Sequence, residues 1–311
     1  MPEYAIELDD ITKSFRDKQA LSGVTFRMPA GTVLGVLGPN GAGKTTTINV
    51  LSTLIRPTSG SAKVAGYDVV TQAAQVRRSI GLTGQYAAID EMLTGRENLV
   101  LFGELNGLSR AQARIRADEL LEAFSLTDAG GRRVGTYSGG MRRRADIACG
   151  LVAEPAVVFL DEPTTGLDPR SRREVWDLVS SLTGRGTSVL LTTQYLDEAD
   201  ALSDSIVVID HGRVIAEGTA DELKERVGGS FCQVTPVHTA DGPRIAEALS
   251  GLGDVSTDPD TGALSIPAPG GLNTLSEVFR RLEALDIEVG DIALRKPSLD
   301  EVFFTLTAPA P

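Results

Sequence analysis

The chain has 311 residues, of which 41% are hydrophobic, and its formal net charge is −12. This content is enough for one large core and a smaller second one, and the acidic balance argues against a nucleic-acid partner, which needs a basic face. No apolar run approaches the roughly 18 residues of a membrane span, and no secretion signal opens the chain. We therefore expect a cytosolic protein, and any membrane role would have to come through a partner.

The first elements predicted along the chain are strands. Residues 4–15 and 21–29 alternate apolar and polar side chains, which predicts an antiparallel edge sheet. Residues 33–38, VLGVLG, form a short continuous apolar run that is typical of a buried strand.

The next segment predicts a phosphate-binding loop, because it matches the pattern G-x-x-x-x-G-K-[ST] between a buried strand and a helix. In this context successive backbone amides and the helix N-terminus converge on phosphates. Lys44 is expected to reach the β- and γ-phosphates, and the Thr45 hydroxyl to ligate Mg²⁺. The predicted nucleotide-binding residues here are Gly38, Pro39, Asn40, Gly41, Ala42, Gly43, Lys44, Thr45 and Thr46.

Short apolar strands then alternate with amphipathic helices, which predicts an α/β fold with a covered, mostly parallel sheet. The strands are expected at 157–161, 188–193 and 205–210, and helices at 110–124 and 170–184. Asp161 and Glu162 close the first of these strands, beside the phosphate loop in such a sheet. Asp161 is expected to hold the Mg²⁺ shell, and Glu162 to orient or deprotonate the attacking water.

The pattern changes near residue 228, so we expect a domain over 1–228 and a second over 229–311. The second part predicts the order β-α-β-β-α-β of a ferredoxin-like α+β unit, followed by a last helix. It contains 12 acidic and 5 basic residues, and so carries over half of the net charge.

Further segments in the right order resemble the ATP-binding-cassette (ABC) superfamily. Phe15 resembles its adenine-stacking aromatic, YSGGM at 137–141 its signature, and TTQYLDEAD at 192–200 its switch segment. Gln85 resembles the Q-loop glutamine, and Asp168 ends a segment that resembles the D-loop. The tail RKPSLDEVFFTLT, with YSGGMRRR, is similar to the daunorubicin-resistance family of exporter ATPases, which has mycobacterial relatives implicated in lipid export.

This resemblance implies a P-loop NTPase cassette with a parallel core sheet, an antiparallel edge sheet and a helical subdomain. It implies an ATPase that uses ATP and Mg²⁺, with Gln85 joining Thr45 and Asp161 at the metal. It also implies a homodimer bound to membrane permease subunits at the cytoplasmic face of the membrane, powering export of anthracycline-type drugs or complex lipids. The signature residues, expected to face the ATP of the partner subunit, are Ser138, Gly139, Gly140 and Met141.

Two positions depart from the superfamily pattern. Met141 replaces the usual glutamine of the signature, and a thioether donates no hydrogen bond. Gln194 replaces the usual histidine of the switch; its amide can donate to the γ-phosphate but cannot take up a proton. In the family the stretch after Gln85 forms a cleft for a coupling helix of the membrane subunit, which implicates Ala87, Ala88, Ile89 and Met92.

Two alternatives remain at this point. A soluble ABC ATPase of translation or DNA repair would dimerise on ATP without transport, but such proteins carry two cassettes or long insertions. A regulatory module would close on ATP without hydrolysing it, and Glu162 argues against that.

Overall fold

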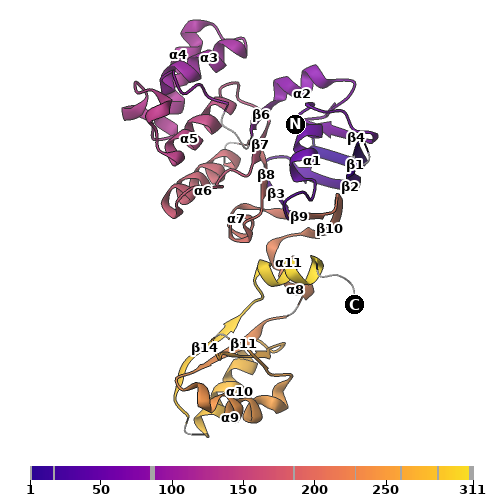
Figure 1. Cartoon of the computed structure of the whole chain (residues 1–311), viewed down its shortest axis with the longest axis vertical. Helices are drawn as coiled ribbons and strands as arrows, with labels where there is room; N and C mark the ends of the chain where they lie inside the picture. The colour runs from indigo at the N-terminus through magenta and orange to yellow at the C-terminus, as the bar shows by residue number, and fades with distance from the viewer. Residues whose placement is uncertain are drawn as a thin grey trace. The chain divides into compact units, whose positions relative to one another are not determined.

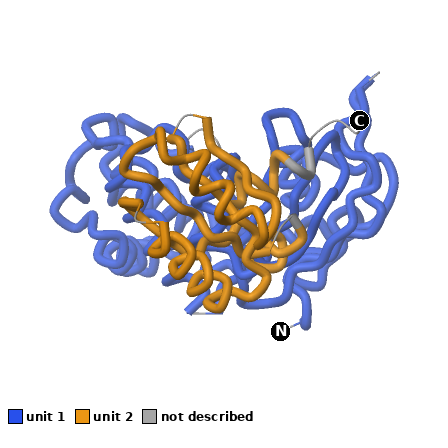
Figure 2. The backbone as a smooth tube through the Cα atoms, turned by 90° about the horizontal axis from the view of Figure 1, so that it is seen from below, with its two compact units in different colours: residues 1–220 blue, residues 221–311 orange. Residues whose placement is uncertain are grey.

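A computed structural model describes residues 2–16, 18–84, 88–184, 186–227, 229–259, 261–285 and 287–307. Its contacts divide the chain into two compact units, residues 1–220 and 221–311 (Figures 1 and 2). The division falls eight residues before the sequence break, because the helix α8 (Ala220–Val227) is grouped with the second unit.

The first unit is built on a six-stranded sheet with the order β10-β9-β3-β8-β7-β6. Five strands run parallel, and only β10 pairs antiparallel with its neighbour among the described strands. The predicted α/β class with a parallel core is therefore confirmed. The strands are β3 (Val33–Leu37), β6 (Ile80–Thr83), β7 (Val157–Asp161), β8 (Ser188–Thr193), β9 (Ser205–Asp210) and β10 (Arg213–Gly218).

The second sheet of this unit is antiparallel, as expected, but it has four strands rather than the two predicted. The additional strands β4 and β5 are short and rich in polar residues, which weakens their sequence signal. The order is β2-β1-β4-β5. The strands are β1 (Tyr4–Phe15), β2 (Lys18–Pro29), β4 (Ser59–Val64) and β5 (Tyr67–Asp68).

The parallel sheet separates two apolar cores, because successive side chains of a strand point to opposite faces. In β7, Val157 and Phe159 join the core shared with the antiparallel sheet and α1, whereas Val158 and Leu160 join the core under the helices. The helices of this unit are α1 (Lys44–Leu51), α2 (Ala73–Ser79), α3 (Gly95–Leu105), α4 (Arg110–Ala123), α5 (Gly139–Gly150), α6 (Pro169–Thr183) and α7 (Leu196–Leu202).

The second unit has its own antiparallel sheet, with the order β12-β13-β11-β14. Two helices pack with it around a separate core that includes Val234, Ile245 and Leu282. Its elements after α8 are β11 (Phe231–Pro236), α9 (Gly242–Leu249), β12 (Ser256–Thr257), β13 (Leu264–Pro267), α10 (Leu272–Glu283), β14 (Val289–Arg295) and α11 (Leu299–Thr307). Among the described residues of both units, no helix combines the length and apolarity needed to cross a membrane.

Removal of residues 221–311 should leave a folded first unit. The apolar clusters of the first unit contain residues no later than Ile209, and the cluster of the second begins at Cys232. A chain ending at residue 220 should therefore keep one cooperative thermal transition and bind ATP. A loss of no more than about 1–2 kcal/mol should lower its melting temperature by only a few degrees. Loss of the transition in circular dichroism would show that the two units depend on one core.

Candidate functional site

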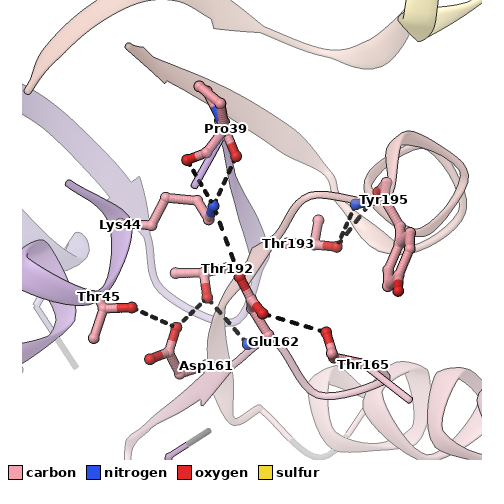
Figure 3. A network of polar contacts seen from close by, with 10 residues as sticks. Pro39, Lys44, Thr45, Asp161, Glu162, Thr165, Thr192, Thr193 and Tyr195 are labelled. Carbon is pink, nitrogen blue, oxygen red and sulfur yellow. Dashed lines mark hydrogen bonds and ion pairs between the residues drawn. The ribbon is translucent and has the colours of Figure 1, made fainter. Parts of the chain in front are cut away.

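The phosphate loop joins β3 to α1 and is shaped by glycines. Gly41 and Gly43 have φ of +83° and +115°, a region that side chains with a Cβ rarely adopt. Gly43 also leaves no space, because a Cβ there would lie 2.9 Å from the carbonyl oxygen of Ala20. The buried Lys44 folds back into this loop and donates from Nζ to the carbonyl oxygens of Gly38, at 2.7 Å, and Pro39, at 3.2 Å (Figure 3).

The two acids at the end of β7 lie beside the loop, as the parallel topology requires (Figure 3). Lys44 Nζ is 3.8 Å from Glu162 Oε1, and both side chains are about 95% buried. Thr45 Oγ1 donates to Asp161 Oδ1 at 3.3 Å. Burial lowers the pKa of Lys44, and the charges of Glu162 and Asp161 oppose that shift. The site therefore holds the desolvated ammonium of Lys44, from the start of α1, beside two acids at the end of β7.

The residues present fit a magnesium ion. Mg²⁺ prefers oxygen ligands and is held in such sites by one or two protein groups together with substrate phosphates. The Thr45 hydroxyl and the Asp161 carboxylate place two such oxygens next to each other, at the first turn of α1. The third predicted ligand, Gln85, lies outside the described residues.

Glu162 sits in a strained turn. Its φ is +48°, and a non-glycine residue in this region costs roughly 1–3 kcal/mol unless its surroundings impose the conformation. The amide of Glu162 donates to both the carbonyl and the hydroxyl oxygen of Thr192, each at 3.1 Å. Thr165 Oγ1 donates to Glu162 Oε2 at 3.3 Å. The strain is thus maintained by neighbours at the position predicted to act on water.

A hollow of about 320 Å³ opens above the loop. Phe15 lines it with 47% of its surface exposed, and Lys13 Nζ lies 5.0 Å from the centre of the ring. An exposed aromatic face beside a phosphate loop can stack on a purine base. The other residues lining the hollow are Lys18, Ala20, Asn40, Gly41, Gly43, Lys44, Thr45, Thr46 and Glu162.

The signature residues form the N-terminus of α5. Ser138 is the N-cap, and its Oγ accepts from the amide of Met141 at 3.2 Å. Ser138 and Gly139 are exposed, whereas Gly140 packs so tightly on α6 that a Cβ would lie 2.4 Å from Ser171 Oγ. Met141 packs against the core under the helices. The glycines thus expose a helix N-terminus that carries a partial positive charge.

Asp168, the predicted D-loop residue, is the N-cap of α6. Its Oδ1 accepts from the amides of Arg170 and Ser171 at 3.0 Å, and its Oδ2 from Ser171 Oγ at 2.7 Å. The hydrogen bond from the backbone amide of Ser171 is the main cause that lowers the pKa of Asp168. The predicted D-loop acid therefore fixes the start of the helix against which Gly140 packs.

The remaining predicted residues belong to the switch position and to the coupling cleft, and most of those that the structure describes are exposed. Gln194 directly follows β8 and is exposed, and its side chain makes no hydrogen bond to the described part of the chain. Of the coupling-cleft residues, Ala87 lies outside the described ranges. Ala88 and Met92 are exposed, with Met92 at 67%, but Ile89 is buried in the core under the helices.

Two residues with direct contacts to the site were missed from sequence. Thr192 Oγ1 donates to Asp161 Oδ1 at 2.5 Å, from the strand that neighbours β7. Arg143, inside the run RRR after the signature, donates to the carbonyl oxygen of Asp161 at 3.0 Å. The position of Thr192 at the end of a buried strand was a usable signal. A run of arginines, in contrast, resembles a solvated helix face.

The chain is similar to a known family and to known structures. The family model described as ABC transporter matches residues 21–165. The chain is 56% identical to the doxorubicin resistance ATP-binding protein DrrA of Mycobacterium tuberculosis, over 98% of this chain and 94% of that protein. It is 57% identical to the daunorubicin resistance ATP-binding protein DrrA3 of Streptomyces coeruleorubidus, over 99% and 97%. A dimeric ATP-binding cassette with ADP and phosphate bound, in a post-hydrolysis state, is 25% identical with a TM-score of 0.63, over 69% of this chain and 98% of that one.

The fold and the loop thus define a P-loop ATPase of the cassette type. The chain belongs to the daunorubicin- and doxorubicin-resistance family of ABC transporter ATP-binding proteins, and its activity is ATP hydrolysis that drives export. The resemblance drawn from the motifs is confirmed. The alternative of a translation or DNA-repair ATPase is not favoured, because these relatives match over nearly the whole chain.

Replacement of Thr192 by valine should weaken the site without changing side-chain shape. Valine cannot donate to Asp161 or accept from the Glu162 amide, so the free energy of unfolding should fall by about 1–3 kcal/mol. ATP turnover should slow by roughly tenfold, which corresponds to about 1.4 kcal/mol. Urea unfolding and phosphate release measure the two effects.

Ser188→Ala is the matched control, because Ser188 is a buried hydroxyl at the opposite end of β8 that accepts from the amide of Gly31 at 2.8 Å. It should lower stability to a similar extent and leave turnover unchanged within about twofold. Equal slowing by both variants would show that Thr192 acts only through general stability.

Proposed function

We propose that this protein binds Mg-ATP at the phosphate loop, hydrolyses it with Glu162 as the base, and drives export of hydrophobic drugs of the anthracycline type or of complex lipids. The observation that supports it most directly is the buried cluster of Lys44, Asp161 and Glu162 at the mouth of the loop. The drug class follows from the doxorubicin and daunorubicin resistance named for its relatives.

The residues of the loop divide the work of binding. The loop amides and the N-terminus of α1 hold the phosphates, and Lys44 moves its ammonium from the loop carbonyls to the β- and γ-phosphates. Thr45, Asp161 and Gln85 would hold Mg²⁺, which when bound neutralises phosphate charge. Phe15 stacks on the adenine from the rim of the hollow.

The proposal assigns the action on the attacking water to Glu162. Its carboxylate lies near the end of the Lys44 side chain, where the γ-phosphate binds, and the Thr165 hydroxyl donates to one of its oxygens. General bases must lie within hydrogen-bond reach of the proton they accept, directly or through one water. Gln194 orients the γ-phosphate through its amide and takes no part in proton transfer.

Two copies close around two ATP molecules, with Ser138, Gly139, Gly140 and Met141 of one subunit facing the ATP of the other. The exposed N-terminus of α5 and the dimeric form of a similar cassette support this arrangement. The subunits associate with membrane permease subunits at the cytoplasmic face, and Ala88 and Met92 offer exposed surface for that contact.

Glu162→Gln tests the assignment of the base. Glutamine has the same shape but accepts no proton, so turnover should fall at least about 100-fold, while the ATP dissociation constant stays within about threefold. The ATP-bound dimer should accumulate and elute early in size-exclusion chromatography. Glu174→Gln, which alters an acid of α6 paired with Arg144 and Arg170, is the control and should leave the rate unchanged. A Glu162→Gln rate within threefold of the parent would remove Glu162 from the mechanism.

Substitution of Gln194 tests the switch position. Gln194→Ala should slow turnover by roughly two- to tenfold, because one donor worth about 0.5–1.5 kcal/mol is lost. Gln194→His keeps a donor that titrates near neutral pH, so its rate should gain a dependence on pH between about 6 and 8. The measurement is the steady-state rate against pH at saturating Mg-ATP. Identical profiles for parent and both variants would place Gln194 outside the site.

A further inference from the structure

A buried arginine of the signature helix reaches the backbone around Glu162. Arg143, on the second turn of α5, is only 9% exposed. Its Nε donates to the carbonyl oxygen of Pro163 at 2.8 Å, and one terminal nitrogen donates to the carbonyl oxygen of Asp161 at 3.0 Å. One planar guanidinium therefore holds the peptide groups on both sides of the strained residue.

The other terminal nitrogen of Arg143 links this turn to the segment after β6. It donates to the carbonyl oxygen of Gly84 at 2.8 Å and lies 3.5 Å from Asp146 Oδ2. Asp146 is itself 4% exposed, and its Oδ1 accepts from the amide of Ala88 at 2.8 Å. The pair thus fixes the described residues on either side of 85–87 and the two carbonyls around Glu162.

We propose that Arg143 and Asp146 are positioning residues for ATP hydrolysis: they form an internal brace that holds the Glu162 turn in its strained geometry and ties it to Gly84 and Ala88. The inference rests on the proposed function in one respect, because it takes Glu162 as the base. Neither residue touches the phosphate loop in the described contacts, so both act through the backbone they hold.

The geometry favours this role over one of simple stabilisation. Buried ion pairs contribute little net stability compared with apolar groups of the same size. The guanidinium of Arg143 instead donates to three carbonyl oxygens, one from the residue after β6 and one from either side of Glu162. Without it, the carbonyl oxygens of Asp161 and Pro163 would lose the donor that they share, so the turn would be held less firmly and the φ of Glu162 could relax toward the negative values that a glutamate prefers.

The chain provides a matched control at the next position. Arg144 also lies on α5 and also donates to a carbonyl oxygen, that of Phe124 at 2.9 Å, and it pairs with Glu174 at 3.4 Å. Its contacts join α5 to the C-terminal end of α4 and to the second turn of α6, and they do not include the Glu162 turn.

The test compares Arg143→Gln with Arg144→Gln in the full chain. Arg143→Gln should lower kcat at least about tenfold and leave the ATP dissociation constant within about threefold, because the phosphate loop is untouched. Amide hydrogen exchange of a peptide covering residues 157–168 should become faster in Arg143→Gln and not in Arg144→Gln. Equal kcat losses in the two variants, or unchanged exchange in Arg143→Gln, would overturn the proposal.

Two further variants separate positioning from folding. Arg143→Met combined with Asp146→Leu removes both buried charges together, so the protein should stay folded while kcat remains at least tenfold low. Full kcat in that folded double variant would also overturn the proposal. In a Glu162→Gln background, Arg143→Gln should cause no further loss of the residual rate, because the group it positions is already absent.

The two hypotheses fail in different ways. If Glu162→Gln alone leaves the parent rate intact, the assignment of the base is wrong, and the exchange comparison still decides whether Arg143 holds the turn. If Glu162→Gln abolishes turnover but Arg143→Gln has no effect on kcat, the proposed function stands and the brace is wrong.

Discussion

The burial of the Lys44 ammonium is the constraint around which the site is arranged. A buried cation needs compensating partners, since removing it from water is costly. The compensation comes from two loop carbonyls and from Glu162 at 3.8 Å. The two loop carbonyls follow β3, and Glu162 follows β7. The parallel pairing of β3, β8 and β7 therefore brings these partners together. The same pairing brings Thr192 to Asp161, and the site is thus a direct product of strand order.

That arrangement leaves Lys44 able to exchange partners. Its carbonyl contacts are weaker than a contact with phosphate, which carries more charge and several acceptor oxygens. Successive amides of a phosphate loop converge on the phosphates, so a bound phosphate would replace the carbonyls as the partner of the lysine. The strained turn at Glu162 also supplies a partner for Lys44. Its backbone has a positive φ in place of the extended conformation usual at a strand end, and in this turn the carboxylate lies beside Lys44.

The sequence predicts the parts of the site that are local in the chain. The phosphate loop, the acids that end β7 and the cap of α5 each depend on residues within one turn or one strand end. The run RRR shows where such prediction stops. Successive helix positions point about 100° apart, so Arg142 pairs with Glu91 at the surface, Arg143 turns inward to three carbonyls, and Arg144 reaches Phe124. Composition alone cannot tell these directions apart, since the inward one is set by distant segments that lie under α5.

The first two turns of α5 therefore carry two features of interest, the exposed cap and Arg143. The exposed cap, Ser138 with Gly139, lies at the surface, and Arg143 contacts the Glu162 turn little more than one helical turn later, about 7 Å along the axis. Because a helix of 12 residues moves as a unit, any force on the cap acts on the contacts of Arg143 as well. Gly140 packs closely on Ser171 of α6, so α6 is coupled to the same end of α5. Asp168, the cap of α6, accepts a hydrogen bond from the hydroxyl of that serine. If two copies close as proposed, the contact of the partner subunit with the cap would act on the geometry of the Glu162 turn through Arg143 alone, without a long chain of intermediate contacts.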